Sequence, residues 1–277
     1  MRAIALPPSL AWIAKRTCIA IVFAWAVASV VFLANDAVLH DRSIVAQYCN
    51  DFARLLAGDL GRSLRDGSPV AGDIARRLPN TLELLGFAAL LSALIGIPGG
   101  LFAATGRHAA LDRFAVALSD VLLAVPVFVV GTLLILIFAQ PASRTMPAIA
   151  IAIGLAAFVF RMTRDAVLDV TQRSYVRTAR ASGLGSTRIL LHHVLPNALL
   201  PVMTQFAQYL GTLIGGTLLV EYVFGYPGLA GLLVEAAKAH DYPLVQGVVL
   251  VVSLLLVASN LAADLLRAAI DPGERAA

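Results

Sequence analysis

Charged residues are scarce in this sequence. Asp, Glu, Lys and Arg make up 14% of its 277 residues, whereas soluble domains average about 25%. Hydrophobic residues account for 59%, and the mean hydropathy is +0.84. A single soluble core of this length is too small to bury so much apolar surface, and lipid is the solvent that accepts the excess. The composition therefore excludes an ordinary soluble globular protein.

Lysine and cysteine are nearly absent, and each shortage excludes a class of site. Lys15 and Lys238 both follow alanine, so the chain lacks the Gly-Lys-Ser/Thr sequence with which many ATPases hold phosphate. Cys18 falls in an apolar run and Cys49 in a polar loop, so we expect no disulfide between them. No His-Glu-x-x-His or Gly-x-Ser-x-Gly motif occurs. We expect no catalytic residue, no metal site and no cofactor, and therefore a protein that is not an enzyme.

Long uncharged runs are what the sequence has in abundance. A helix needs about 17–25 residues to cross roughly 30 Å of hydrocarbon. Five runs have this length, and a sixth, 145–160, is marginal because Arg161 and Arg164 follow it and would extend to the headgroups. The six expected spans are 17–34, 84–106, 121–143, 145–160, 194–220 and 242–263. The sequence thus predicts an all-α integral membrane protein with six transmembrane helices, the fourth short or tilted.

The positive charges predict the orientation of these spans. With a cytoplasmic N-terminus, 13 Lys and Arg residues fall on the inner side and 8 on the outer side, as the positive-inside rule requires. We expect N-in and C-in topology, with inner ends at 1–16 and 273–277, an outer loop at 35–79, and a core of five spans at 80–272. The first run could also be a secretory signal, but its 18 uncharged residues exceed the usual signal core of about 7–15.

Carboxylates inside the expected spans are few: Glu83, Asp120 and Asp264. Ion-driven carriers place proton or sodium sites within the bundle. Glu83 falls at the outer end of its span and Asp120 near the inner end of its own, so we interpret both as interfacial or paired groups. An ion-driven secondary carrier acting without an ATPase remains the alternative function. A membrane scaffold whose basic loop binds lipid is a second one.

The inner loop at 161–197 carries six arginines and two aspartates, a net charge of +4. Charge alone fits either positive-inside signalling with lipid contact or a docking surface. The loop also has a pattern: residues 174–182 favour a helix, Gly183-Leu184-Gly185 breaks it, and Ser186 is placed to cap a second helix. That helix would run through Leu195, where Pro196 ends it or leads into the next span. Helix, break and helix form a rigid element that suits transmission of motion to a soluble partner.

The same loop resembles a known signature. The runs YVRTARASGL at 175–184 and HVLPNALLP at 193–201 are similar to the cytoplasmic loop of ABC-importer permeases, closest to the oligopeptide, dipeptide and nickel transporter branch. The general loop begins Glu-Ala-Ala, whereas this chain has Arg177-Thr178-Ala179, as that branch does. The resemblance implies that 179–191 forms a coupling helix that docks on an ATPase subunit.

Further blocks match that branch in the same order along the chain. They are GDLG at 58–61, RLPNTLEL at 77–84, GIP at 96–98, PVF at 126–128, EYVFGYPGL at 221–229, DYPLVQG at 241–247, and the stretch from Asn260 to Asp271-Pro272. The connection at 140–144 is shorter than the family pattern. The resemblance extends over most of the chain and implies a type I ABC importer permease fold in a bacterial cytoplasmic (inner) membrane.

The resemblance also implies roles and partners. The residues expected to couple to the ATPase are Arg177, Thr178, Ala179, Arg180, Ala181, Ser182, Gly183, Leu184, Leu195 and Pro196. The candidates for the outer loop or gate are Glu221, Phe224, Pro227, Gly228, Asp241, Tyr242 and Pro243. The expected partners are a homologous second permease, two ATP-binding subunits, an extracytoplasmic solute-binding protein and membrane lipid, with no nucleic acid. Peptides and nickel or nickel chelates are the implied substrates, and we favour peptides.

Several local features carry expectations of their own. Val70, Ile74 and Leu78 recur every four residues, which predicts an amphipathic helix under the headgroups, or alternatively in contact with the binding protein. The glycine-rich stretch 221–231 is expected to be an irregular loop. The pairs Gly96/Gly100 and Gly211/Gly215 indicate close helix packing, within the chain or at a subunit interface. The prolines Pro98, Pro126 and Pro201 are candidate bending points.

Overall fold

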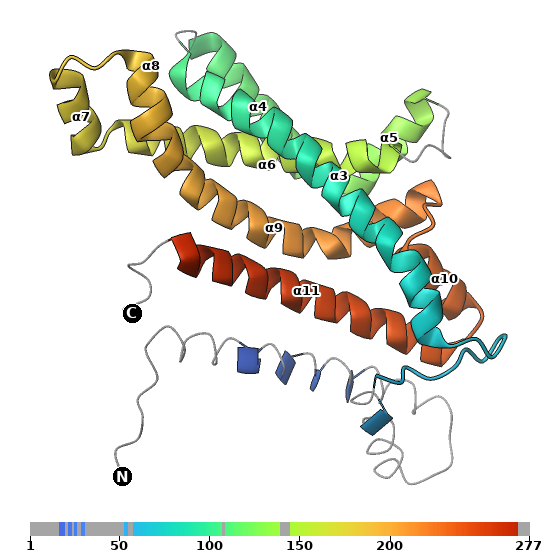
Figure 1. The fold of residues 1–277 in the computed structure, drawn as a ribbon. Helices are drawn as coiled ribbons and strands as arrows, with labels where there is room; N and C mark the ends of the chain where they lie inside the picture. The colour runs from blue at the N-terminus through green and yellow to red at the C-terminus, as the bar shows by residue number, and fades with distance from the viewer. Residues whose placement is uncertain are drawn as a thin grey trace, which may run out of the picture. The chain divides into compact units, whose positions relative to one another are not determined.

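The computed structural model describes residues 58–106, 109–138 and 145–270, with side chains to residue 265, and short pieces at 17–19, 22–23, 25–26, 29–30 and 53–54. In these ranges the chain is helical and forms no named strand, with one isolated bridge between Arg62 and Pro69. The elements are α3 (Val70–Thr105), α4 (Ala109–Ala124), α5 (Val127–Phe138), α6 (Met146–Thr171), α7 (Ser174–Ala181), α8 (Ser186–Ile189), the π-helix η1 (Leu190–Val194), α9 (Leu195–Phe224), α10 (Leu229–Lys238) and α11 (Tyr242–Ile270) (Figure 1). The expected all-α fold is confirmed.

Within the described residues, three helices are long and apolar enough to cross a membrane alone: Val70–Thr105, Met146–Thr171 and Tyr242–Leu265. Two bent pairs raise the number to five if each pair is one span. These are α4 with α5, bent by 99°, and Ser186–Phe224 with α10, bent by 70°. The expected first span at 17–34 lies for the most part outside the described residues, and so does the connection at 140–144.

Two of the expected spans differ from the structure. The fourth is not short, because α6 continues past Phe160 through both arginines to Thr171, 26 residues in all. The third is not one straight run: α4 begins at Ala109, in the stretch expected to be an inner loop, and Pro126 separates it from α5. Proline lacks an N–H and disfavours helix in the residue before it, which accounts for the break. Pro98 and Pro201, in contrast, lie within α3 and α9.

The chain divides into two compact units, residues 1–83 with 211–277 and residues 84–210. In the first unit, the expected interfacial helix at 70–78 is instead the beginning of α3. Its apolar residues pack on protein, because Val70 and Ile74 are buried against Leu229, Leu232 and other side chains of α10 and α11. The prediction of an irregular loop over 221–231 is wrong at both ends: α9 continues to Phe224, α10 begins at Leu229, and only 225–228 is non-helical.

In the second unit, α3 packs closely on α6 through the predicted glycine pair. A Cβ on Gly96 would lie 2.7 Å from Cβ of Val159, and one on Gly100 would lie 2.5 Å from the carbonyl oxygen of Phe160. The intrachain interpretation of Gly96/Gly100 is therefore confirmed. In the first unit Gly211 likewise faces Ser259 of α11, whereas a Cβ on Gly215 would meet nothing within 4 Å.

Candidate functional site

Residues 172–194, here called the basic segment, contain the helix, break and helix expected from the sequence. Gly183 ends α7 with a positive φ of 80°, a conformation that costs glycine little. Its N–H donates to the carbonyl of Arg180 at 3.1 Å, and the N–H of Leu184 donates to that of Ala179 at 3.3 Å. These two bonds form a Schellman turn, which satisfies the free carbonyls at the end of a helix. The break is thus a fixed corner rather than a loose loop.

The second helix of the basic segment differs from the sequence prediction. Its N-cap is Gly185, not Ser186, and no side chain bonds to the cap. After α8 the chain makes one π-helical stretch, η1, and passes directly into α9 at Leu195. Pro196 therefore lies at the second position of α9, directly after the π-helical stretch. A single coupling helix over 179–191, which the family resemblance implied, is not present because the Gly183 turn interrupts it.

A compact apolar cluster fixes the basic segment to the membrane helices. Its buried members, here called the anchor cluster, are Val167 and Val170 of α6, Val176 of α7, Ile189 of α8, Val194 of η1 and Ala198 of α9. Leu184, directly after the glycine corner, packs against the same cluster. Figure 1 shows α7 and α8 at the end of α6 that these contacts join. These contacts join the basic segment to α6 and to the start of α9.

The opposite face of the basic segment is exposed and cationic. Arg173 pairs with Asp169 at 2.9 Å, and the hydrogen bond from Arg173 to that carboxylate raises the pKa of Arg173. Arg177 donates to the carbonyl of Gln172 at 3.0 Å. Arg180 and Arg188 form no ion pair with any residue that the structure describes. The outward side chains of Tyr175 and Leu191 are 39% and 49% exposed. Arginine with an aromatic side chain is typical of protein interfaces.

The other candidate region lies in the first unit, at residues 58–83 and 221–244, and is here called the buried-carboxylate region. Glu221, in the last turn of α9, is fully buried. Its Oε2 accepts the N–H of Ala230 at 2.8 Å, in the first turn of α10, where unpaired N–H groups favour an anion. Thr81 contacts the same carboxyl and accepts the N–H of Leu229 at 3.0 Å. Oε1 has no hydrogen-bond partner among the described residues.

Gly228 lies directly against this carboxyl group. A Cβ built on Gly228 would overlap the carboxyl atoms of Glu221, so any larger residue requires this buried carboxyl to shift. Next to it, the side-chain amide of Asn80 donates to the carbonyl of Pro227 at 2.7 Å. Phe224 is buried, and Gly225 with φ of 59° turns the chain between α9 and α10. The stretch 225–228 is therefore held from both sides by α3 and α9.

Asp241 organises the other end of α10. Its carboxylate accepts the Ser63 hydroxyl and, through Oδ1, the N–H groups of Leu64 at 3.1 Å and Leu244 at 3.4 Å. The bond from Leu244 makes Asp241 the cap of α11, with Tyr242 and Pro243 in its first turn. His240, just before it, has φ of 55°. The Ser63 and Leu64 contacts attach residues 63–64 to the start of α11.

A polar hollow of about 320 Å³ opens beside Asp241. Charged side chains of both signs line it: Arg65, Asp66, Asp73, Arg76, Arg77 and Glu235. The backbone N–H of Ser68 holds the pKa of Asp66 below its usual value, so this carboxylate is ionised at neutral pH. The hollow is therefore lined by both positive and negative side chains, and it does not present an electrostatic potential of one sign.

The sequence matches known proteins over most of its length. Residues 96–276 match the family model described as "Binding-protein-dependent transport system inner membrane component". The chain belongs to this family. It is 34% identical over 260 residues, 90% of this chain and 85% of the relative, to the glutathione transport system permease protein GsiC of Escherichia coli O6:H1. It is 36% identical over 249 residues, 82% of this chain and 79% of the relative, to the oligopeptide transport system permease protein AppB of Bacillus subtilis. The predicted membership of the oligopeptide and dipeptide branch of ABC-importer permeases is thereby confirmed.

Solved structures confirm the fold of this permease. A chain of the MetNI methionine ABC transporter, in inward-facing conformations, matches 72% of the permease with a TM-score of 0.63 and 20% identity, and 96% of that chain is covered. A chain of an amino acid ABC transporter crystallised with histidines matches the same share with a TM-score of 0.63, 16% identity and 94% coverage. The type I importer fold is shared. The permease is a multi-pass inner-membrane protein.

The structure brings together some residues that sequence reasoning singled out and adds others. Arg177 to Ala181 lie on α7, Ser182 and Gly183 form its end, and Leu195 and Pro196 begin α9. Of the outer candidates, Glu221 and Gly228 touch each other, while Asp241 belongs to a separate cluster. Sequence reasoning gave no role to Thr81 or Ser63, which complete these two clusters. Their hydroxyl groups carried no recognisable signal, because their partners are 148 and 178 residues away in the sequence.

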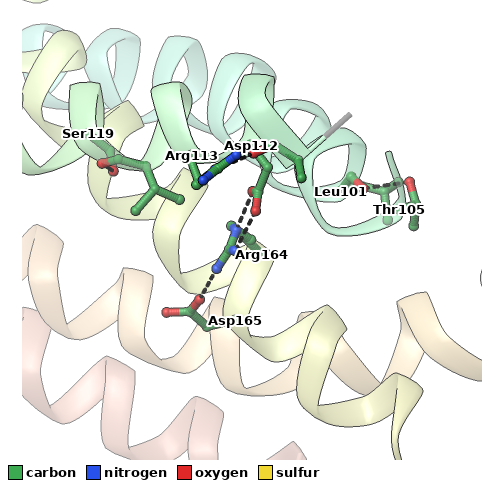
Figure 2. A network of polar contacts seen from close by, with 9 residues as sticks. Leu101, Thr105, Asp112, Arg113, Ser119, Arg164 and Asp165 are labelled. Atoms are coloured by element: carbon green, nitrogen blue, oxygen red, sulfur yellow. Dashed lines mark hydrogen bonds and ion pairs between the residues drawn. The ribbon is translucent and has the colours of Figure 1, made fainter. Parts of the chain in front are cut away.

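Sequence reasoning also missed a polar network between α4 and α6. Arg164 lies between Asp112 and Asp165 (Figure 2), bonded to both. Asp120, considered as a proton site, pairs with Arg161, in agreement with the interpretation of Asp120 as a paired group. The partners in these interhelical pairs are 41 and 52 residues apart in the chain, so no local pattern joins them.

Proposed function

We propose that this permease is one of two homologous transmembrane subunits of an ATP-driven importer, and that its basic segment docks on an ATP-binding subunit. One observation carries the proposal: the basic segment buries its apolar side in the anchor cluster and exposes a cationic side around a fixed glycine corner. The partner subunits hydrolyse ATP, and this chain performs no chemistry. An extracytoplasmic binding protein delivers the solute.

The anchoring explains how such a docked segment would drive transport. Val167 and Val170 belong to α6, and Val194 and Ala198 belong to η1 and α9. A push on α7 and α8 is passed to two membrane helices, because close-packed side chains transmit displacement rather than absorb it. A segment joined to the spans by flexible chain would lose that displacement.

Charge reversal at the exposed face tests the docking. Arg180 and Lys238 each supply the basic side chain in the last turn of a short helix, α7 and α10. Arg180→Glu should lower co-purification of the ATP-binding subunit at least about tenfold, the range for truncating a central interface arginine. Lys238→Glu, the matched control, should leave it unchanged. Equal losses in both variants, or none in Arg180→Glu, would contradict the docking.

The proposed orientation has a direct test in the same two residues. N-in and C-in topology places the basic segment in the cytoplasm and α10 toward the outside, in line with the distribution of positive charge. With Cys18 and Cys49 changed to serine, Arg180→Cys should react with an impermeant maleimide only after the cells are opened. A cysteine in place of Lys238 should react in intact spheroplasts. The reverse pattern would overturn the orientation.

For the substrate we propose a short peptide or a peptide-like solute such as glutathione. Support comes from the relatives, which are named for glutathione and oligopeptide transport. Nickel or a nickel chelate is the second candidate. Mass spectrometry of the ligand retained by the co-purified binding protein distinguishes them, since a bound peptide and a bound metal differ in mass and in removal by EDTA. A retained nickel complex would contradict the peptide proposal.

A further inference from the structure

Two ion pairs join α4 to α6 in the second unit. Nε and Nη2 of Arg164 donate to the two carboxylate oxygens of Asp112 at 2.6 and 2.7 Å, a bidentate arrangement that fixes both distance and orientation. Nη1 of Arg164 bonds to Asp165 at 3.0 Å, and Arg161 pairs with Asp120. Figure 2 shows the first of these pairs bridging the two helices.

The Asp112–Arg164 pair is the less exposed of the two. The side chains of Arg164 and Asp112 are 21% and 25% exposed, against 34% and 58% for Arg161 and Asp120. An ionisable group within a membrane span is costly unless it is paired. Removal of Arg164 leaves the charge of Asp112 without this partner, so the contact holds α4 against α6 more firmly than an exposed ion pair would.

Apolar packing between the same helices is incomplete. A hollow of about 330 Å³ lies among α3, α4 and α6. Small side chains from the three helices line much of it: Gly96, Gly99, Ala115, Ser119, Ala152 and Ala156. On the α3 side the glycine contacts at Gly96 and Gly100 bring α3 directly onto α6. On the α4 side, the ion pairs supply directional contacts across a loosely filled interface.

The position of Arg164 along α6 connects it to the basic segment. Val167 and Val170, one and nearly two turns further along the same helix, belong to the anchor cluster. Asp112 lies in the first turn of α4, which leads through Pro126 to α5. A displacement of the basic segment thus reaches Arg164 through less than two turns of helix, and passes from there to Asp112.

We infer that Arg164 is a positioning residue that makes α4 and α5 follow α6 when the basic segment moves. This rests on the proposed docking of the basic segment on an ATP-binding subunit. The Asp112–Arg164 pair stays closed through the transport cycle, so α4 and α6 move as one body. Without the pair, the partner subunits still hydrolyse ATP and α6 still moves, but α4 no longer follows and hydrolysis is uncoupled from transport.

The test measures ATP hydrolysed per solute transported by the complete complex in proteoliposomes. Arg164→Gln should raise this ratio at least about fivefold, the lower end of allosteric coupling factors, while co-purification of the ATP-binding subunit is unchanged. The double variant Asp112→Arg with Arg164→Asp should restore the ratio. Arg54→Gln is the matched control, because it removes an exposed arginine that pairs with Asp59 at 2.9 Å and belongs to neither α4, α6 nor the basic segment, and it should leave the ratio unchanged.

A second readout follows the helices themselves. Spin labels at Phe114 of α4 and Leu168 of α6, with Cys18 and Cys49 changed to serine, report the distance between the helices with and without ATP. The distance should stay constant in the parent complex and change on ATP binding in Arg164→Gln. An unchanged ATP ratio in Arg164→Gln, with ATP-dependent transport by the parent complex, would overturn the inference. Parent transport that needs no ATP would instead overturn the proposed function.

Discussion

The basic segment and the buried-carboxylate region end their helices in the same way and place their charged groups in opposite ways. Gly183 after α7 and Gly225 after α9 both take positive φ, and both follow with the paired hydrogen bonds of a Schellman turn. Before Gly225, Glu221 is buried and its carboxyl accepts the N–H of Ala230 on α10, whereas Arg180 and Arg188, on either side of Gly183, are exposed. The same corner therefore serves a self-contained structure in one region and, in the other, the exposed surface that we propose docks on another protein.

This difference predicts whether a substitution changes the stability of the permease or its association with a partner. A buried carboxylate whose bonds are internal is needed for folding, because its loss leaves donors unpaired. An exposed arginine contributes little to folding and acts through partners. Variants of the buried-carboxylate region should change stability first, and variants of the basic segment should change association first.

The largest effect is expected at Gly228. Gly228→Ala places a methyl group on the Glu221 carboxyl, and overpacking of this kind should reduce the free energy of unfolding by about 3 kcal/mol. Thermal unfolding of the purified permease in detergent measures the loss. Gly231→Ala is the control, because its Cβ would meet only the Tyr226 carbonyl at an ordinary 3.5 Å. Equal unfolding temperatures for the two variants would show that Gly228 is not in close contact with the Glu221 carboxyl.

Asp241 comes next. Asp241→Ala removes the acceptor for Ser63, Leu64 and Leu244 and should cost about 2 kcal/mol through the lost cap and the unpaired donors. Asp241→Asn keeps an acceptor oxygen and should lose less. Hydrogen exchange at the Leu64 and Leu244 amides reports the local opening. Slow exchange of both amides in Asp241→Ala would show that the carboxylate does not hold the outer loop.

Gly183 tests the basic segment. Gly183→Val forces a β-branched residue to a φ of 80°, a local cost of about 1–2 kcal/mol. Membrane insertion should remain intact, while co-purification of the ATP-binding subunit and coupled uptake fall. Gly185→Ala is the matched control, because its φ is −65° and a Cβ there meets nothing within 4 Å. Normal uptake with full recovery of the complex in Gly183→Val would refute a role for the corner.

The smallest effect is expected at His240, where a third helix, α10, ends with positive φ on a residue other than glycine. His240→Gly relieves the left-handed strain at some cost in chain entropy, for a net gain of about 0.5 kcal/mol. The unfolding temperature of the permease should rise slightly, with uptake unchanged. A lower unfolding temperature would mean that the imidazole makes a stabilising contact of its own.

Local signals in the sequence were sufficient to predict those helix breaks that depend on a single residue. Gly183 predicted the corner after α7 because few other residues adopt its conformation, and the small residues at Gly96 and Gly100 predicted close packing on another helix. The family resemblance was carried by such blocks and held over most of the chain. Each of these features depends on residues that lie within one or two helical turns of one another, so the pattern can be read from the sequence alone.

Other features depend on contacts that no local pattern contains. The glycines at 225–231 suggested a loop, but Leu229, Leu232 and Ala236 form the buried side of α10 because α3 and α11 cover them. Arg161 and Arg164 suggested the end of a span, yet α6 continues because carboxylates of α4 compensate both charges. In each case a distant partner, absent from the local sequence, decides the outcome.

The number of residues in the π-helical stretch η1 determines which direction α8 faces relative to α9. Ile189 and Val194 are five residues apart, a spacing that would place them about 140° apart on a regular α-helix, yet both are buried in the anchor cluster. The wider turn of η1 brings them to the same side. Loss of one residue between them would leave them four apart, about 40° on a regular α-helix, and so still on the same side, whereas one residue more would turn what precedes it by about 100°. The arginines would then face a different direction while every contact of α9 stayed in place, so in this stretch chain length, as much as residue identity, determines what the permease presents to its partner.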